Sequence, residues 1–250
     1  MQVEPITTSI GAEISGVSLA EMNDTTFASL QEALWTHQVL VVRDQNMTPE
    51  EHLDLGRRFG ELHTHPAFAD KGDYPEILQI NNTGKDKTIT EVWHSDVSCD
   101  ERPPSISILR ALEVPVAGGD TMWASQYGAL DLLSPGMVQM LEPLRAVHNN
   151  FDLESVHPVI RTHPETGRRA LYVNKGFTSH FENMTVAESR PLLEYLVSVG
   201  SQPDLTMRHR WQANDVVFWD NRCVMHFAIH DYGDAPRAMR RVTVRGERPV

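Results

Sequence analysis

The chain has 250 residues, 40% of them apolar, which suffices for a buried core in one large domain without disulfide or metal staples. It carries 22 basic and 34 acidic side chains, which give a formal net charge of −12. This balance excludes a general nucleic-acid-binding surface, because phosphate binding requires a positive field.

The first predicted elements are a helix and a strand. Asn23 or Asp24 can cap the helix. Its apolar face has helical spacing and consists of Phe27, Leu30 and Leu34. The β-branched run at residues 39–42 predicts a buried strand directly after this helix.

The second predicted helix has the clearest start signal in the chain. Thr48 caps it, Pro49 takes the first helical position, and Glu51 completes a capping box. Gly60 ends it.

Two further helices are predicted in the second half of the chain. A short one opens at Ser134, which is followed by proline. The other opens at Thr185, which forms a capping-box pattern with Glu188. Because Pro191 lies inside that span, Ser189 is an alternative start.

Short β-rich segments fill much of the remaining sequence. They are residues 76–80, 105–111, 121–124, 170–174, 215–219 and 240–244. Several short strands separated by turn residues favour a sandwich or barrel. We therefore predict a mainly β fold with flanking helices on a double-sheet jelly roll. No repeat or linker divides the chain, so residues 1–250 are expected to form a single domain.

Four histidines are followed two positions later by an acid, a pattern that arises readily by chance. These pairs begin at His52, His94, His163 and His180. Residues i and i+2 share a face on a strand but diverge on a helix, which argues against His52 in its predicted helix. Residues 163–167 predict a hairpin turn with solvated side chains, while the pair at His180 stays possible.

His94 and Asp96 lie in an extended-looking stretch beside Trp93. They can be metal ligands or ordinary surface polar residues. His226, beyond the predicted strand at 215–219, is a candidate third ligand, with a partly buried histidine as the competing interpretation. Two imidazoles and one carboxylate can hold one face of a ferrous ion and leave the other face open for substrates.

The C-terminal segment places two arginines on one side of a predicted strand. Arg237 and Arg241 share a face there and lie about 13 Å apart, at about 3.3 Å per residue. Two guanidinium groups at that separation can reach two anions around a central metal. An ordinary basic edge strand is the competing interpretation, because other arginines are close in sequence.

Taken together, these segments resemble the taurine dioxygenase family, which includes taurine, alkyl-sulfate and chlorophenoxyacetate dioxygenases. The matching motifs are Gly11-Ala-Glu-Ile-Ser-Gly16, Trp93-His94-Ser-Asp96, Gly118-Gly-Asp-Thr-Met-Trp123, Val173-Asn-Lys-Gly-Phe177, Trp219-Asp-Asn-Arg222 and the final arginines. They cover nearly the whole chain. The resemblance implies a double-stranded β-helix, a jelly-roll or cupin-like core, and a dioxygenase that depends on Fe(II) and 2-oxoglutarate.

The resemblance also implies roles for individual residues. His94, Asp96 and His226 match the catalytic Fe(II) ligands. Thr121 and Arg237 match the residues that bind the distal carboxylate of 2-oxoglutarate. Because related halogenases replace the carboxylate ligand with a small residue, the presence of Asp96 predicts hydroxylation and not halogenation.

Five positions match the substrate pocket. Arg241 matches an arginine that binds a sulfonate, His65 a second sulfonate contact, and Phe177 an aromatic wall. Taurine dioxygenase itself has a tyrosine where this chain has Phe68 and an asparagine where it has Thr90. These departures put taurine in doubt and favour a longer or more apolar tail.

The implied reaction consumes 2-oxoglutarate and O2 as co-substrates, releases succinate and CO2, and hydroxylates a small anionic organic substrate. An alkyl sulfonate or sulfate ester is the first expectation. A carboxylate, such as an aryloxyacetate or a carboxylic-acid metabolite, is the alternative. A zinc-dependent hydrolase could use the same triad but gives no role to Thr121 and Arg237. A metal-free jelly roll that only binds small molecules is a further alternative.

The remaining expectations concern setting and partners. Cys99 and Cys223 are too few for a disulfide framework, which favours a reduced, cytoplasmic setting. Both are expected to be small buried hydrophobes. No apolar run reaches the length of about 18 residues that a membrane span needs, and no secretory signal is visible, so no membrane partner is expected. A homo-oligomer is expected from the resemblance alone.

Overall fold

The structure is a computed structural model that describes residues 1–64, 73–83 and 91–250. Its helices are α1 (Asp24–His37), α2 (Pro49–Phe59), α3 (Gln126–Asp131), α4 (Pro135–Leu141) and α5 (Val186–Gly200), with a short 3₁₀ turn at Pro203–Leu205. None of these helices has the length and apolar content that a membrane span requires.

The strands come from every part of the chain. They are β1 (Gln2–Pro5), β2 (Ala12–Ser15), β3 (Val39–Val42), β4 (Leu62–His63), β5 (Ile77–Thr83), β6 (Ile106–Glu113), β7 (Thr121–Ser125), β8 (Arg145–Asn150), β9 (Leu153–Pro158), β10 (Ile160–Thr162), β11 (Arg169–Leu171), β12 (Thr178–Phe181), β13 (Thr206–His209), β14 (Val216–Asp220), β15 (Val224–Ala228) and β16 (Pro236–Val244).

A large sheet and a small sheet frame the centre of the molecule. The large sheet has the order β1-β2-β3-β14-β6-β16-β4, with β5 paired to β16, and the small sheet has the order β13-β7-β15. In the large sheet, Val217 of β14 pairs with Val41 on one side and with Leu109 on the other. Only β2 and β3 run parallel; the other described pairs are antiparallel.

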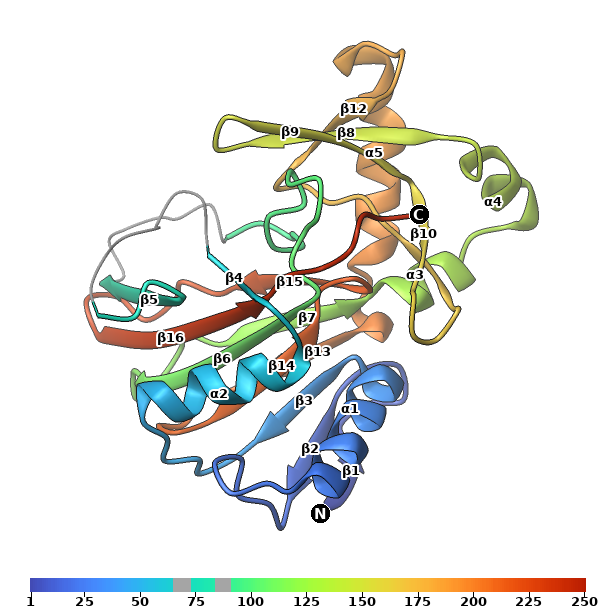
Figure 1. The fold of residues 1–250 in the computed structure, drawn as a ribbon. Coiled ribbons are helices and arrows are strands. Elements are labelled where there is room, and N and C mark those ends of the chain that lie inside the picture. Colours follow the sequence, from blue (N-terminus) through green and yellow to red (C-terminus); the bar gives the residue numbers. More distant parts are fainter. Residues whose placement is uncertain (65–72, 84–90) are drawn as a thin grey trace.

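The strand β3 explains how the large sheet is buried on both faces. Side chains alternate between the faces of a strand. Val39 and Val41 therefore belong to the core that also holds Trp123 of the small sheet, while Leu40 and Val42 pack in the core with α1. Figure 1 shows α1 and α2 together on one side of the large sheet. The buried strand expected at residues 39–42 is thus confirmed.

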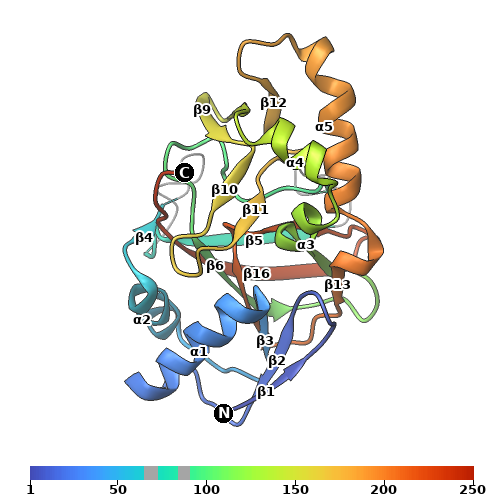
Figure 2. The ribbon, with the colours of Figure 1, turned by 90° about the vertical axis from the view of Figure 1, so that its right-hand side faces the viewer.

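A third layer closes the other end of the molecule. The sheet β12-β8-β9 and the helices α3, α4 and α5 share a separate apolar core, which includes Leu141, Phe181 and Leu196. Figure 2 shows these three helices on the opposite side of the molecule from α1 and α2.

The expected helix starts are confirmed by hydrogen bonds. The side chains of Asn23, Thr48 and Ser134 each accept a backbone N–H of the following turn. The alternative start at Ser189 is wrong, because α5 begins at Val186 and contains Pro191. The capping box of Thr185 with Glu188 starts this helix before the proline is reached.

All six expected strands are present with shifted bounds, and two of the shifts bear on the site. The segment expected at 170–174 is the strand β11, which ends at Leu171. Beyond it, the side chain of Asn174 accepts the backbone N–H of Phe177 and so forms a turn. The strand expected at 240–244 begins earlier, at Pro236, which brings Arg237 into the sheet.

Candidate active site

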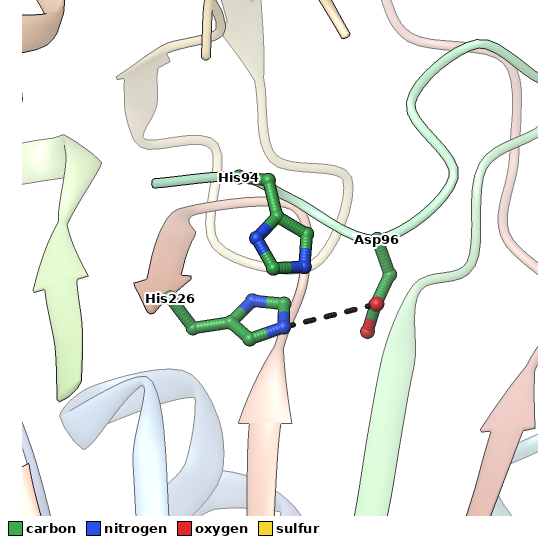
Figure 3. Close-up of side chains that lie close together, drawn as sticks. All are labelled: His94, Asp96 and His226. Atoms are coloured by element: carbon green, nitrogen blue, oxygen red, sulfur yellow. Dashed lines mark ion pairs between the residues drawn. The ribbon is translucent and has the colours of Figure 1, made fainter. Parts of the chain in front are cut away.

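His94 and His226 meet through their main chains. The N–H of His94 donates to the carbonyl of His226 at 3.0 Å, and the N–H of His226 donates to the carbonyl of His94 at 2.8 Å. This bridge joins the end of an extended segment to β15. It places the two imidazoles side by side, with ring centroids 4.0 Å apart (Figure 3).

Asp96 completes the group. Its Oδ1 lies 3.8 Å from His226 Nε2, the contact drawn as a dashed line in Figure 3. One ligand atom from each of the three residues lies within 4.8 Å of the others. The exposed fractions are only 4% for His94, 3% for Asp96 and 6% for His226. The three predicted ligands therefore converge on a shared, buried position.

The protonation states of the three side chains suit a divalent cation. His94 Nδ1 donates to the carbonyl of Val92 at 2.7 Å, which leaves the Nε2 lone pair for a metal. Burial lowers the pKa of His94. Burial, and then the neighbouring His94, lower the pKa of His226 further. Both rings are therefore neutral, so the contact of His226 with Asp96 is a close approach of two ligands and not a pairing of charges.

Asp96 stays ionised despite its burial. Burial alone raises the pKa of its carboxyl, but the positive charge of Arg241 and the hydrogen bond from Ser107 hold this pKa well below its ordinary value. Two neutral imidazoles and one carboxylate on one side of a position are the donor set of non-haem Fe(II) oxygenases. The residues present thus fit the metal that the sequence predicts.

Asp96 is held by contacts on its side chain and on its main chain. Ser107 Oγ donates to Oδ2 at 2.8 Å, and Arg241 donates to Oδ1 at 2.5 Å. The side chain of Asn221 accepts the N–H of Asp96 at 2.7 Å and donates to its carbonyl at 3.0 Å. The sequence prediction missed Ser107. A serine within the apolar run 106–109 could have revealed it, because a buried hydroxyl needs a partner.

The two residues expected to bind 2-oxoglutarate lie at the starts of two strands. Thr121 begins β7, and Arg237 is the second residue of β16. Arg237 Nε donates to the carbonyl of Gly119 at 3.2 Å, two residues before Thr121. Thr121 Oγ1 accepts a hydrogen bond from the indole of Trp211 at 3.0 Å. Both predicted residues are buried, and burial lowers the pKa of Arg237. The nearby Asp120 partly offsets this effect of burial on the pKa, and a bound anion would pair directly with the buried guanidinium.

The predicted substrate residues have different outcomes. The ring of Phe177 lies 6.2 Å from that of His94, beside the metal ligands. Arg241 points at Asp96, a contact that the sequence does not predict. His65, Phe68 and Thr90 lie outside the described residues, and their roles stay predictions.

The expectation that His163 is solvated is wrong. The turn at 163–167 is present, but the side chain of His163 is 1% exposed, and its Nε2 lies 2.8 Å from Asp220 Oδ2. His52 lies in α2 as expected, with its Nε2 on the carbonyl of Ile108. His180 contacts the hydroxyl of Ser179 and belongs to no metal-capable group among residues 1–64, 73–83 and 91–250.

His163, Asp220 and Cys223 form a second close group, but its donor atoms are already engaged. Arg222 donates to both oxygens of Asp220, at 2.8 and 2.7 Å. His163 Nδ1 accepts the backbone N–H of Glu165, so Nε2 is the donor to Asp220. The group is a structural network. As expected, Cys99 and Cys223 are both buried and form no disulfide.

Residues 2–243 match the model of the family described as taurine catabolism dioxygenase TauD, TfdA. The chain belongs to this family. An alpha-ketoglutarate-dependent sulfate ester dioxygenase from Pseudomonas putida is 33% identical, over 100% of this chain and 91% of the relative. An alkylsulfatase from Acinetobacter baylyi is 34% identical, over 99% and 86%.

The fold comparison agrees with the family match. The crystal structure of a taurine dioxygenase from Burkholderia xenovorans superposes with a TM-score of 0.92 and 36% identity, over 100% of this chain and 92% of that one. The predictions of the TauD, TfdA family, of a jelly-roll core and of a dioxygenase dependent on 2-oxoglutarate (α-ketoglutarate) are confirmed.

Proposed function

We propose that this protein binds Fe(II) through His94, Asp96 and His226. It couples the oxidative decarboxylation of 2-oxoglutarate to the hydroxylation of a small organic sulfate ester or sulfonate. The observation that carries the proposal is the convergence of one ligand atom from each of the three side chains on one buried position. Bound Fe(II) would supply the activation of O2, which no amino-acid side chain provides.

The protein's own residues bind and orient the co-substrate. The guanidinium of Arg237 would pair with the distal carboxylate of 2-oxoglutarate, which would neutralise a buried positive charge. The hydroxyl of Thr121, which accepts from Trp211, has its own proton to donate to the same carboxylate. The burial of both residues excludes water from this contact and strengthens it.

The substrate class is inferred from the relatives and from Arg241. The Pseudomonas and Acinetobacter relatives bear names that specify a sulfate ester dioxygenase and an alkylsulfatase. Arg241 would offer its guanidinium to the sulfate or sulfonate group. Hydroxylation of the carbon attached to the sulfate oxygen gives an unstable product. That product breaks its carbon–oxygen bond to yield an aldehyde and free sulfate.

A substrate screen tests the proposal. The purified protein, loaded with Fe(II) under anaerobic conditions, would be mixed with 2-oxoglutarate, O2 and one of three compounds: an alkyl sulfate, an alkyl sulfonate or an aryloxyacetate. Succinate, aldehyde and free sulfate or sulfite would be measured in each mixture. We expect succinate and aldehyde in equal amounts with the sulfate or the sulfonate. Coupled turnover with the aryloxyacetate alone would favour the carboxylate alternative instead.

The same screen separates the dioxygenase from a hydrolase. Zn(II) fills a site of two histidines and one carboxylate readily but does not activate O2. Protein loaded with Zn(II) should therefore form no succinate and release no sulfate. Sulfate release with Zn(II) and without 2-oxoglutarate would support the hydrolase.

The cellular location, oligomeric state and domain organisation of the enzyme are also proposals. We propose a cytoplasmic homo-oligomer in which residues 1–250 form one domain. Light scattering of the purified protein would give its mass, and a mass of 28.2 kDa, that of one chain, would contradict the oligomer.

A further inference from the structure

We infer that Ser107 is a positioning residue that restricts Asp96 to binding the metal through one oxygen. This inference rests on the proposed metal site. The two oxygens of Asp96 have different surroundings. Oδ1 lies 3.8 Å from Nε2 of His226 and so faces the other ligands. Oδ2 lies 2.8 Å from the hydroxyl of Ser107.

Ser107 must donate this hydrogen bond, because an ionised carboxylate only accepts. The serine is fully buried and lies in β6. Its main chain pairs with Trp219 of β14 on one side and with Thr243 of β16 on the other. The main chain of Ser107 is therefore held by strands on both sides, and its hydroxyl donates to Oδ2 from a fixed position.

The hydrogen bond has a consequence for coordination. A carboxylate that binds a metal through one oxygen uses one position, and two imidazoles use two more, which leaves three for co-substrates. A carboxylate that binds through both oxygens would occupy a position that 2-oxoglutarate or O2 needs. Oδ1 also accepts a hydrogen bond from Arg241, but it is the oxygen that faces His226. Because Ser107 holds Oδ2, Oδ1 is the oxygen that we assign to the metal.

The other contacts of Asp96 do not duplicate this role. Asn221 holds the main chain of Asp96, and Arg241 donates to Oδ1. The terminal torsion of an aspartate is broad and roughly two-fold. Arg241 holds the same torsion through Oδ1, but among the described side chains Ser107 is the one that donates to Oδ2. Without Ser107, Oδ2 has no hydrogen bond that competes with the metal.

Metal affinity tests this role without reference to turnover. The dissociation constant for Fe(II) would be measured anaerobically by calorimetry for the wild type and for Ser107→Ala. We expect affinity to fall about 10-fold to 100-fold, the range for losing a hydrogen bond to a metal ligand. The absorption spectrum of the Co(II)-loaded variant should also shift, because the coordination number changes.

An isosteric pair and a matched control separate positioning from packing. Ser107→Thr keeps the hydroxyl. Ser107→Val has the shape of the threonine variant without the hydroxyl, so we expect weaker Fe(II) binding in the valine variant only. Ser105→Ala removes a nearby buried hydroxyl that donates to the carbonyl of Arg245 at 3.2 Å. It should lower the melting temperature of the metal-free protein and leave the Fe(II) affinity unchanged.

Two outcomes would overturn the inference. The first is equal Fe(II) affinity of the threonine and valine variants. The second is an unchanged dissociation constant for Fe(II) in Ser107→Ala. Either result, with wild-type protein that binds Fe(II) and forms succinate, would leave the proposed function intact. Wild-type protein that binds no Fe(II) would instead defeat the proposed function itself.

Discussion

The guanidinium of Arg241 lies 2.5 Å from the carboxylate of Asp96, on the same oxygen that faces His226. An arginine that resembles a substrate-binding residue therefore also pairs with the proposed carboxylate ligand. In the metal-free protein this pair balances one negative charge with one positive charge inside the core. A divalent cation at the same oxygen would add positive charge, which favours the arrival of anions at Arg241.

Arg241→Ala should destabilise the metal-free protein more than the metal-loaded protein. Removing one partner of a buried ion pair lowers the free energy of unfolding by about 3–5 kcal/mol, and a bound cation would compensate Asp96 instead. Urea denaturation with a chelator and with Mn(II) would measure both values. Arg245→Ala, which breaks an exposed pair with Glu61, should cost below about 1 kcal/mol in either condition. Equal losses for Arg241→Ala with and without metal would contradict this expectation.

Asp96→Ala should abolish turnover and weaken Fe(II) binding, because the site loses its only charged ligand. Succinate formation and calorimetric titration would measure the two effects. Asp54→Ala is a matched control, since Asp54 also lies two positions after a histidine but is exposed on α2 and pairs with Arg57. A rate unchanged in Asp96→Ala would remove this residue from the ligand set.

Arg237→Ala should raise the KM for 2-oxoglutarate by about 10-fold to 100-fold, because a hydrogen bond to a charged group contributes about 1.5–3 kcal/mol. Initial rates of succinate formation at varied 2-oxoglutarate would give the value. Arg240 lies on the opposite face of the same strand β16, so Arg240→Ala should leave this KM unchanged. A flat response in Arg237→Ala would reassign the co-substrate carboxylate to another cation.

His148 should make the stability of the protein fall in acid. Burial, and then His157, lower the pKa of His148 to about 3, whereas an unfolded histidine titrates near 6.5. Its contribution is therefore fully present above about pH 6.5 and is lost as the pH falls toward 3, at about 1.4 kcal/mol per pH unit. His148→Gln should make this decline shallower by that amount. Urea denaturation between about pH 6 and pH 4 would check it, and parallel slopes in variant and wild type would refute it.

Local signals in the sequence were enough for four of the five α-helices of the described residues; α3 was not predicted. The capping box at Thr48 and the apolar run at 39–42 each act over a few residues, and both are present in the structure. The motif at residues 93–96 and the histidine at 226 predicted through resemblance the three side chains that converge in the structure. Their spacing alone left surface polar residues as an equal possibility.

Contacts between distant residues escaped prediction. The pair of Arg241 with Asp96 spans 145 positions, and the burial of His163 depends on Asp220, 57 positions away. Nothing in the neighbouring sequence encodes either partner. The hairpin of β8 and β9 was also missed, because the segment 145–158 is polar and lacks the β-rich runs that mark the other strands.

The reciprocal main-chain bridge between His94 and His226 has a consequence for metal choice. Main-chain hydrogen bonds hold His94 and His226 together, so little ordering would oppose metal binding, and the proposed site would accept several transition metals. Divalent first-row ions bind such donors in a fixed order in which copper and zinc exceed ferrous iron. The active share of the enzyme in a cell would therefore follow the relative supply of these metals and not the selectivity of the protein.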